Sequence, residues 1–147
     1  MIENFLDKPF RSLSSSASGL IVKYGLFGIR LKLLNNDFNE DNLDVHKILD
    51  VNGLIQQNWD KFESRQNQVK FSCDILSAFN KQQVLLGEAG TGLGKSFSYL
   101  TASIIYSIEN KIPVVISTYT KHLQDQLFYK DIPNFSKLTG VPISAII

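Results

Sequence analysis

The sequence has little of several features that would assign it to a special class. Cys73 is the one cysteine among 147 residues, so the chain can form no internal disulfide and no cysteine metal site of its own. No apolar run approaches the ~20 residues of a membrane-spanning helix. Glu3 and Asp7 lie where a signal peptide would be positive, and Lys23 interrupts the one candidate apolar run. We therefore expect a soluble protein of the reducing cytoplasm with no membrane partner.

A strong excess of either charge is also absent. Residues 1–60 hold six Lys or Arg against eight Asp or Glu, and residues 61–147 hold nine against six. This mild basic lean of the second part is compatible with a phosphate-bearing ligand but is too small to indicate nucleic acid. Apolar residues make up 44% and charged residues 20%. The composition and the length are therefore those of one ordinary globular domain.

Residues 1–45 carry no pattern that names a chemistry. The alternation over Ile29–Leu33 predicts a half-buried strand. Gly25 and Gly28 lie between that strand and the apolar segment Leu20–Val22, so a short hairpin fits there. We treat residues 1–45 as an N-terminal leader of unknown role.

Residues 46–147 alternate between helical and strand patterns. Apolar side chains at helical spacing predict helices near residues 45–49, 65–80, 96–110 and 121–130. Short apolar runs without alternation predict strands at Val84–Leu86, at Val114–Thr118 and from Pro142 to Ile147. This order, with short connections, predicts an α/β fold: a parallel sheet with right-handed crossovers and flanking helices, of which about three strands are present.

The loop at residues 88–96, EAGTGLGKS, lies between the first predicted strand and the helix that follows. From Ala89 to Ser96 it matches the phosphate-loop pattern G-x-x-x-x-G-K-S/T, with Ala at the first position. A chain that wraps a triphosphate must point successive backbone N–H groups inward, which the glycines permit. The start of the next helix adds unpaired N–H groups and a positive dipole end. The loop therefore predicts an ATP site.

Within this site, Lys95 and Ser96 are the predicted catalytic residues. Lys95 would reach the β- and γ-phosphates, and the Ser96 hydroxyl would be a ligand of Mg²⁺. All eight loop residues are predicted to contact the nucleotide: Ala89, Gly90, Thr91, Gly92, Leu93, Gly94, Lys95 and Ser96. The alternative is a glycine-rich turn before a helix, but the strand and helix patterns on either side favour the nucleotide site.

Two further fragments accompany the loop: FESRQNQ at residues 62–68 precedes it, and STYTKHLQDQL at residues 117–127 follows it. In this order the three fragments resemble the DinG/XPD-like family of superfamily 2 DNA helicases, and its bacterial DinG branch in particular. The first is similar to the family's R-x-x-Q adenine motif and the last to its S-T-x-T-x-x-L-Q-x-Q-L motif Ia. The resemblance runs from about Ile48 to Ile147 and implies a phosphate-loop, RecA-like domain.

The resemblance also implies roles for residues outside the loop. Gln68 would pair its side-chain amide with adenine, and Arg65 would brace the same pocket. Phe62 or Trp59 would stack on the base, and the sequence does not choose between them. The residues implied to contact single-stranded DNA are Thr118, Thr120 and Gln124. The alternative for these residues is structural: a solvated glutamine at a helix start, and Thr120 as an N-cap.

For the full-length family protein, the resemblance implies ATP-driven translocation on single-stranded DNA with 5′→3′ polarity, in repair or replication. It also implies an iron–sulfur cluster that this chain does not ligate. No D-E-A-H segment follows Leu127, and the arginines of a second domain are missing. Because loss of an arginine finger alone costs about 10³–10⁵ in rate, we expect the chain to be inactive by itself. We expect it to be the front portion of a longer helicase whose downstream domains complete the site.

Two other classes remain open. A different phosphate-loop ATPase or a small-molecule kinase would make the two flanking fragments coincidental, whereas a non-catalytic remnant would not bind Mg²⁺-ATP. Isolated His46 and His122 are predicted not to be metal ligands. Cys73 lies on the inward face of its predicted helix and is expected to belong to the core. Glu88 is expected to have a structural role rather than to act as a general base.

Overall fold

The computed structural model describes residues 27–33, 43–90 and 92–147. The hairpin predicted with Leu20–Val22, most of the leader, and Thr91 lie outside these residues. In chain order the elements are β1 (Phe27–Leu33), α2 (Val45–Leu49), α3 (Leu54–Asn58), α4 (Gln66–Asn80), α5 (Lys95–Asn110), β2 (Val114–Thr118), α6 (Lys121–Gln126), the π-helical turn η2 (Leu127–Asp131), α7 (Ile132–Thr139) and β3 (Ile143–Ile146). Among the described helices, none is long and apolar enough to cross a membrane.

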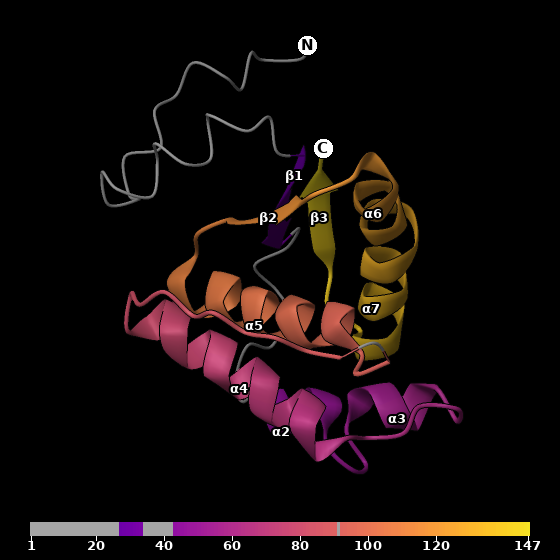
Figure 1. Ribbon diagram of the computed structural model, residues 1–147. Coiled ribbons are helices and arrows are strands. Elements are labelled where there is room, and N and C mark those ends of the chain that lie inside the picture. Colours follow the sequence, from indigo (N-terminus) through magenta and orange to yellow (C-terminus); the bar gives the residue numbers. More distant parts are fainter. Residues whose placement is uncertain (1–26, 34–42, 91) are drawn as a thin grey trace.

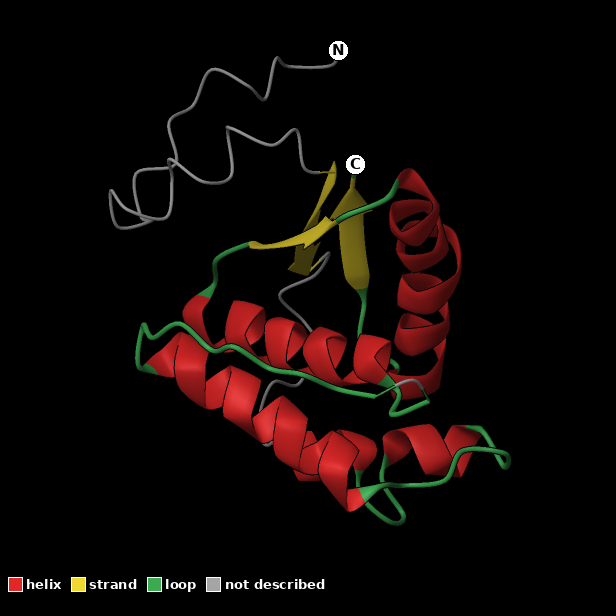
Figure 2. Cartoon of the chain, viewed as in Figure 1, coloured by secondary structure: helices red, strands yellow, loops and turns green. Residues whose placement is uncertain are grey.

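The helix α5 is the centre of the fold. Figure 1 shows the sheet on one side of α5, with α4 on the other side and α6, η2 and α7 forming a continuous column beside the sheet. The same layers appear in Figure 2, where the segment joining α4 to α5 is a long loop. The residues of α5 in the hydrophobic core cluster are Leu100, Ile104, Ile105 and Ile108. Their helical spacing confirms the helix predicted at residues 96–110.

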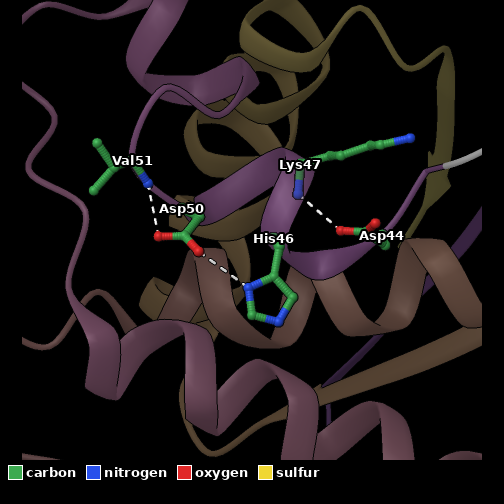
Figure 3. Close-up of polar contacts among 5 residues, drawn as sticks. All are labelled: Asp44, His46, Lys47, Asp50 and Val51. Carbon is green, nitrogen blue, oxygen red and sulfur yellow. Dashed lines mark hydrogen bonds and ion pairs between the residues drawn. The ribbon is translucent and has the colours of Figure 1, made fainter.

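The short helix α2 begins and ends where the sequence predicts. Asp44 caps it by accepting a hydrogen bond from the Lys47 backbone N–H at 2.8 Å (Figure 3). Val45, Ile48 and Leu49 are buried, and the helix ends before Asp50. His46 pairs with Asp50 at 3.1 Å on the exposed face of the helix, and hydrogen bonds from the His46 ring and from the Val51 N–H lower the pKa of Asp50. His46 is thus a surface residue with a local partner.

The helix α4 spans nearly the predicted residues and packs on α5. Val69 is buried, while Cys73 and Leu76 are partly buried against the core. The contact between the two helices is made through small hydroxyl residues, because Ser72 and Ser98 are both fully buried there. The helical spacing of Val69, Cys73 and Leu76 predicts this inward face, and the structure confirms it.

The sheet differs from the prediction. The strands β2 and β3 form where apolar runs predict them, and β1 forms over the alternating segment. Their order is β2-β1-β3, and β1 pairs antiparallel with both neighbours, from Phe27 opposite Thr118 on one side and Leu33 opposite Ile143 on the other. Among the described residues the sheet is therefore antiparallel, not parallel. The RecA-like class as a whole stays a prediction.

The strand predicted at Val84–Leu86 is not formed. Residues 83–90 are irregular, and Val84 and Leu86 are 91% and 94% exposed. β1 lies between β2 and β3, and the segment at residues 83–90 pairs with none of these three strands and runs past α4. Gly87 lies against the ring of Phe71, since a Cβ at this glycine would come within 2.5 Å of it. The prediction was wrong because an apolar run does not reveal which strand it will pair with.

The last predicted helix is longer and less regular than expected. Thr120 caps α6, as predicted, by accepting a hydrogen bond from the Leu123 N–H at 3.2 Å. The spacing of Leu123, Leu127 and Phe128 predicts that all three face inward. Leu127 is buried and Phe128 is partly buried, but Leu123 is 45% exposed, contrary to the prediction. The π-helical turn η2 inserts extra backbone between α6 and α7, which changes the faces of the column that point inward. The helix α7 was not predicted, although Pro133 in its first turn and Gly140 after its end are typical helix signals.

Candidate nucleotide-binding site

The predicted phosphate loop lies where the N-termini of α4 and α5 meet. Gly92 and Gly94 have φ angles of +84° and +81°, in the left-handed region that favours glycine. Gly94 is the N-cap of α5, and no side chain caps the first N–H groups of that helix. The first backbone N–H groups of α5 therefore have no side-chain acceptor and can donate hydrogen bonds to a ligand at this end of the helix.

Arg65 and Gln68, the predicted adenine-pocket residues, contact the loop itself. The Gln68 side-chain amide donates a hydrogen bond from Nε2 to the Gly94 carbonyl oxygen at 3.0 Å. Arg65 donates from its guanidinium to the Gly92 carbonyl oxygen. Gln68 is only 2% exposed, so its amide lies under the loop in this conformation. Adenine pairing by Gln68 stays a prediction, and the bond to Gly94 uses one of the two N–H groups of the side-chain amide.

Lys95 and Ser96 lie at the first turn of α5, and both have partners within the site. The Lys95 ammonium donates to the Ala89 carbonyl oxygen at 2.7 Å, which closes the loop from its first residue to its lysine. The Tyr99 hydroxyl lies 3.4 Å from the Ser96 hydroxyl, and burial raises the pKa of Tyr99. Lys95 remains exposed on the surface. Because the Lys95 ammonium is exposed, a phosphate can reach it and replace the Ala89 carbonyl oxygen as its hydrogen-bond partner.

The residues of the loop fit a phosphate group. A Cβ added at Gly90 or Gly92 would meet nothing within 4 Å, so the loop has open space beside it. An uncapped helix start and an exposed ammonium suit a polyanion. For Mg²⁺ the described residues offer the Ser96 hydroxyl, and they contain no cluster of three or more His, Cys, Asp or Glu side chains. Glu88 is exposed beside the loop.

The two aromatic residues predicted as alternatives for base stacking differ in exposure. Phe62 is 8% exposed and belongs to the core cluster, whereas Trp59 is 41% exposed. Their ring centroids are 6.1 Å apart, and each also lies beside Phe97. Trp59 is thus the one of the two with surface left for a ligand.

The predicted DNA-contact residues are arranged at the end of β2 and the start of α6. Thr118 donates from its hydroxyl to the Thr120 carbonyl oxygen at 3.0 Å, which shapes the turn. Thr120 is exposed, whereas Gln124 is 6% exposed and lies behind the turn. Tyr119, between the two threonines, is 89% exposed. An aromatic residue at the x position of the S-T-x-T segment could have marked Tyr119 as a further candidate for contact with DNA.

The chain is similar in sequence to proteins that are named as DNA helicases and exonucleases. It is 36% identical over 93 residues to the ATP-dependent DNA helicase YoaA of Haemophilus influenzae, a match that covers 63% of this chain and 14% of that protein. It is 41% identical over 76 residues to YoaA of Escherichia coli, covering 52% of this chain and 11% of that protein.

The chain is also similar to proteins named DinG. The chain is 35% identical over 86 residues to the protein named 3′-5′ exonuclease DinG of Bacillus subtilis, covering 58% of this chain and 9% of that protein. These relatives confirm the resemblance to the bacterial DinG branch. The chain spans at most about a seventh of the length of these three relatives. No family profile and no solved structure matches the chain.

Proposed function

We propose that this chain is the ATP-binding part of a DinG-type, ATP-dependent DNA helicase. The observation that carries the proposal is the bare, glycine-shaped loop at the uncapped start of α5, with Lys95 beside it. The relation to DinG and YoaA proteins supports the helicase class. The incomplete RecA-like fold and the cytoplasmic location belong to the same proposal.

The chain's own residues would bind and orient the phosphates. Main-chain N–H groups from the loop and the first turn of α5 would hold the anion, and Lys95 would exchange the Ala89 carbonyl for the β- and γ-phosphates. Ser96 would give its hydroxyl to Mg²⁺ and leave its contact with Tyr99. ATP, when bound, supplies the free energy of phosphoryl transfer to water. Because the arginine finger of such enzymes is worth about 10³–10⁵ in rate, we expect the residues of this loop by themselves to bind ATP without hydrolysing it.

The turn after β2 would contact the backbone of single-stranded DNA. The Thr118 hydroxyl donates to the Thr120 carbonyl oxygen at this turn, and the Thr120 hydroxyl caps α6 beside it. Contacts to phosphate carry no sequence information. Gln124 is buried, so we propose that it stabilises the turn by packing and does not contact DNA directly. Translocation with 5′→3′ polarity, roles in repair or replication, and the iron–sulfur cluster are proposed for the longer protein with its downstream domains.

The test is a titration of the chain with a fluorescent ATP analogue in the presence and absence of Mg²⁺. Lys95→Ala should weaken binding by about 10- to 100-fold, because it removes a charge-assisted contact. Lys137→Ala, which removes an exposed lysine from α7, is the matched control and should bind like the parent. If Lys95→Ala and the parent bind equally, or neither binds, the chain is a non-catalytic remnant.

A second measurement separates the helicase from another phosphate-loop ATPase. Fluorescence anisotropy with single-stranded oligonucleotides should show binding by the parent that weakens in the double variant Thr118→Val, Thr120→Ser. This variant removes one hydroxyl and keeps the N-cap of α6. Unchanged anisotropy, together with intact ATP binding, would favour the other ATPase class.

A further inference from the structure

We propose that Arg65 and Gln68 act as positioning residues that shape the phosphate loop through its carbonyl groups. This inference rests on the proposed ATP site and adds a mechanism to it. It gives the N-cap and the first turn of α4 a task that does not depend on the base of the nucleotide. The argument starts from the two hydrogen bonds that cross from this segment to the loop.

The contact of Gln68 is part of a closed, buried set of hydrogen bonds. The Gly94 carbonyl oxygen accepts both the Gln68 amide at 3.0 Å and the Ser98 N–H at 3.2 Å. The Ser98 hydroxyl in turn donates to the Gln68 carbonyl oxygen at 3.3 Å. Gln68 and Ser98 are 2% and 0% exposed. Because a buried amide left without a partner is costly, this arrangement ties the first turn of α5 to α4.

Glycine is the one residue type that fits position 94. A Cβ at this position would collide with the Gln68 amide, and the positive φ of Gly94 would be strained in any other residue. The glycine therefore permits the close approach of Gln68 as well as the loop conformation.

Arg65 extends the same interaction to the middle of the loop. Its guanidinium donates to the Gly92 carbonyl oxygen, and it lies 3.9 Å from the Glu63 carboxylate. The Arg65 side chain is 51% exposed, so its contribution to stability is small compared with that of a buried pair. Its effect on the loop is one of orientation.

The geometry of the peptide bond links these carbonyl contacts to phosphate binding. In a trans peptide the C=O of one residue and the N–H of the next point in opposite directions, and the described residues contain no cis peptide. When Arg65 and Gln68 hold the carbonyls of Gly92 and Gly94, the N–H groups of Leu93 and Lys95 point away from α4. These two amides are among the donors expected to face the phosphates.

Two hypotheses for Gln68 then make opposite predictions. If Gln68 reads adenine, its loss should weaken ATP binding and leave a ligand without a base unaffected. If it positions the loop, its loss should weaken ATP, GTP and inorganic tripolyphosphate by the same factor, because all three present the same phosphates.

The experiment measures the affinity of the chain for Mg²⁺-ATP, Mg²⁺-GTP and Mg²⁺-tripolyphosphate by competition with a fluorescent nucleotide. Gln68→Met keeps the length of the side chain and removes the donor, and Gln66→Met, at an exposed position of α4, is the control. We expect Gln68→Met to weaken all three ligands by about three- to tenfold and Gln66→Met to change none. Unchanged tripolyphosphate affinity in Gln68→Met would overturn the proposal.

A second variant keeps the test decisive if Gln68→Met does not fold, as judged by circular dichroism. Arg65→Gln lies at a half-exposed position and should fold, and it should also weaken tripolyphosphate, whereas Lys70→Gln on the same helix should not. An unaffected tripolyphosphate affinity in Arg65→Gln would likewise count against the loop role. A different result would overturn the proposed ATP site itself: tripolyphosphate binding by Lys95→Ala that is as tight as binding by the parent.

Discussion

The hydroxyl of Ser72 on α4 donates a hydrogen bond to the carbonyl oxygen of Ser98 on α5 at 2.9 Å. Both residues are fully buried, and their small side chains allow the two helices to pack closely. Since α5 carries the phosphate loop at its start and α4 carries Gln68 near its own start, this helix contact sets the distance between the two parts of the site.

We expect Ser72→Val to lower the free energy of unfolding by about 1–3 kcal/mol, because the added methyl groups overpack the contact between α4 and α5. Ser72→Ala should cost about 1 kcal/mol through the lost hydrogen bond. Urea denaturation followed by circular dichroism measures both values. Ser77→Val, at a half-buried position of the same helix, is the control. Equal stabilities of Ser72→Val and the control would show that the helices do not pack through Ser72.

The exposure of Val84 and Leu86 predicts that polar residues are tolerated there. Val84→Lys and Leu86→Lys should each change the free energy of unfolding by no more than about 0.5 kcal/mol, as is usual for exposed positions. Leu100→Ala, in the core of α5, should cost about 2–5 kcal/mol in the same denaturation experiment. A loss of several kcal/mol in Leu86→Lys would instead mean that this segment is a buried strand.

The N-cap of α6 predicts a graded response at Thr120. Thr120→Ala should destabilise the protein by about 1 kcal/mol, because the Leu123 N–H loses its acceptor. Thr120→Ser keeps the oxygen and should retain most of the stability. Thermal denaturation can rank the two variants against His122→Ala, an exposed change in the same turn. If Thr120→Ser were as unstable as Thr120→Ala, the hydroxyl would not be the cap.

The thiol of Cys73 should react slowly in the native protein. Burial, followed by the nearby Asp74 and Asp44 carboxylates, raises the pKa of Cys73, so the thiol stays protonated to a higher pH than a free cysteine does. Because the thiolate is the reactive form, the rate with a disulfide reagent should still be rising at a pH where the urea-unfolded chain has levelled off. Asp74→Asn should increase the native rate at fixed pH, and a native thiol that reacts faster than the unfolded one would contradict this.

Local patterns predicted most of the helices and the glycine positions of the loop. The spacing of Leu100, Ile104 and Ile108 marks α5, and Thr120 marks the start of α6. The loop motif also located Gly92 and Gly94, whose positive φ angles no other residue type adopts readily. These features are readable because each depends on residues within a few positions along the chain.

Features that depend on distant partners were not predicted. Leu123 was expected to face inward, but in α6, ahead of the turn η2, it is 45% exposed. The burial of Gln68 under Gly94 likewise needs α4 and α5 to be placed side by side. The patterns of a single sequence do not show whether two segments that are 26 residues apart lie in contact.

The amino-acid sequence by itself therefore determined the glycine-shaped loop, the helix that follows it and the relation to DinG-type helicases. The tertiary structure alone decided which segment fills the centre of the sheet, and it selected β1 rather than Val84–Leu86. The physical reason is that the hydrogen bonds of a strand are made with a neighbour remote in sequence, so an apolar run by itself does not specify whether it pairs or with which strand.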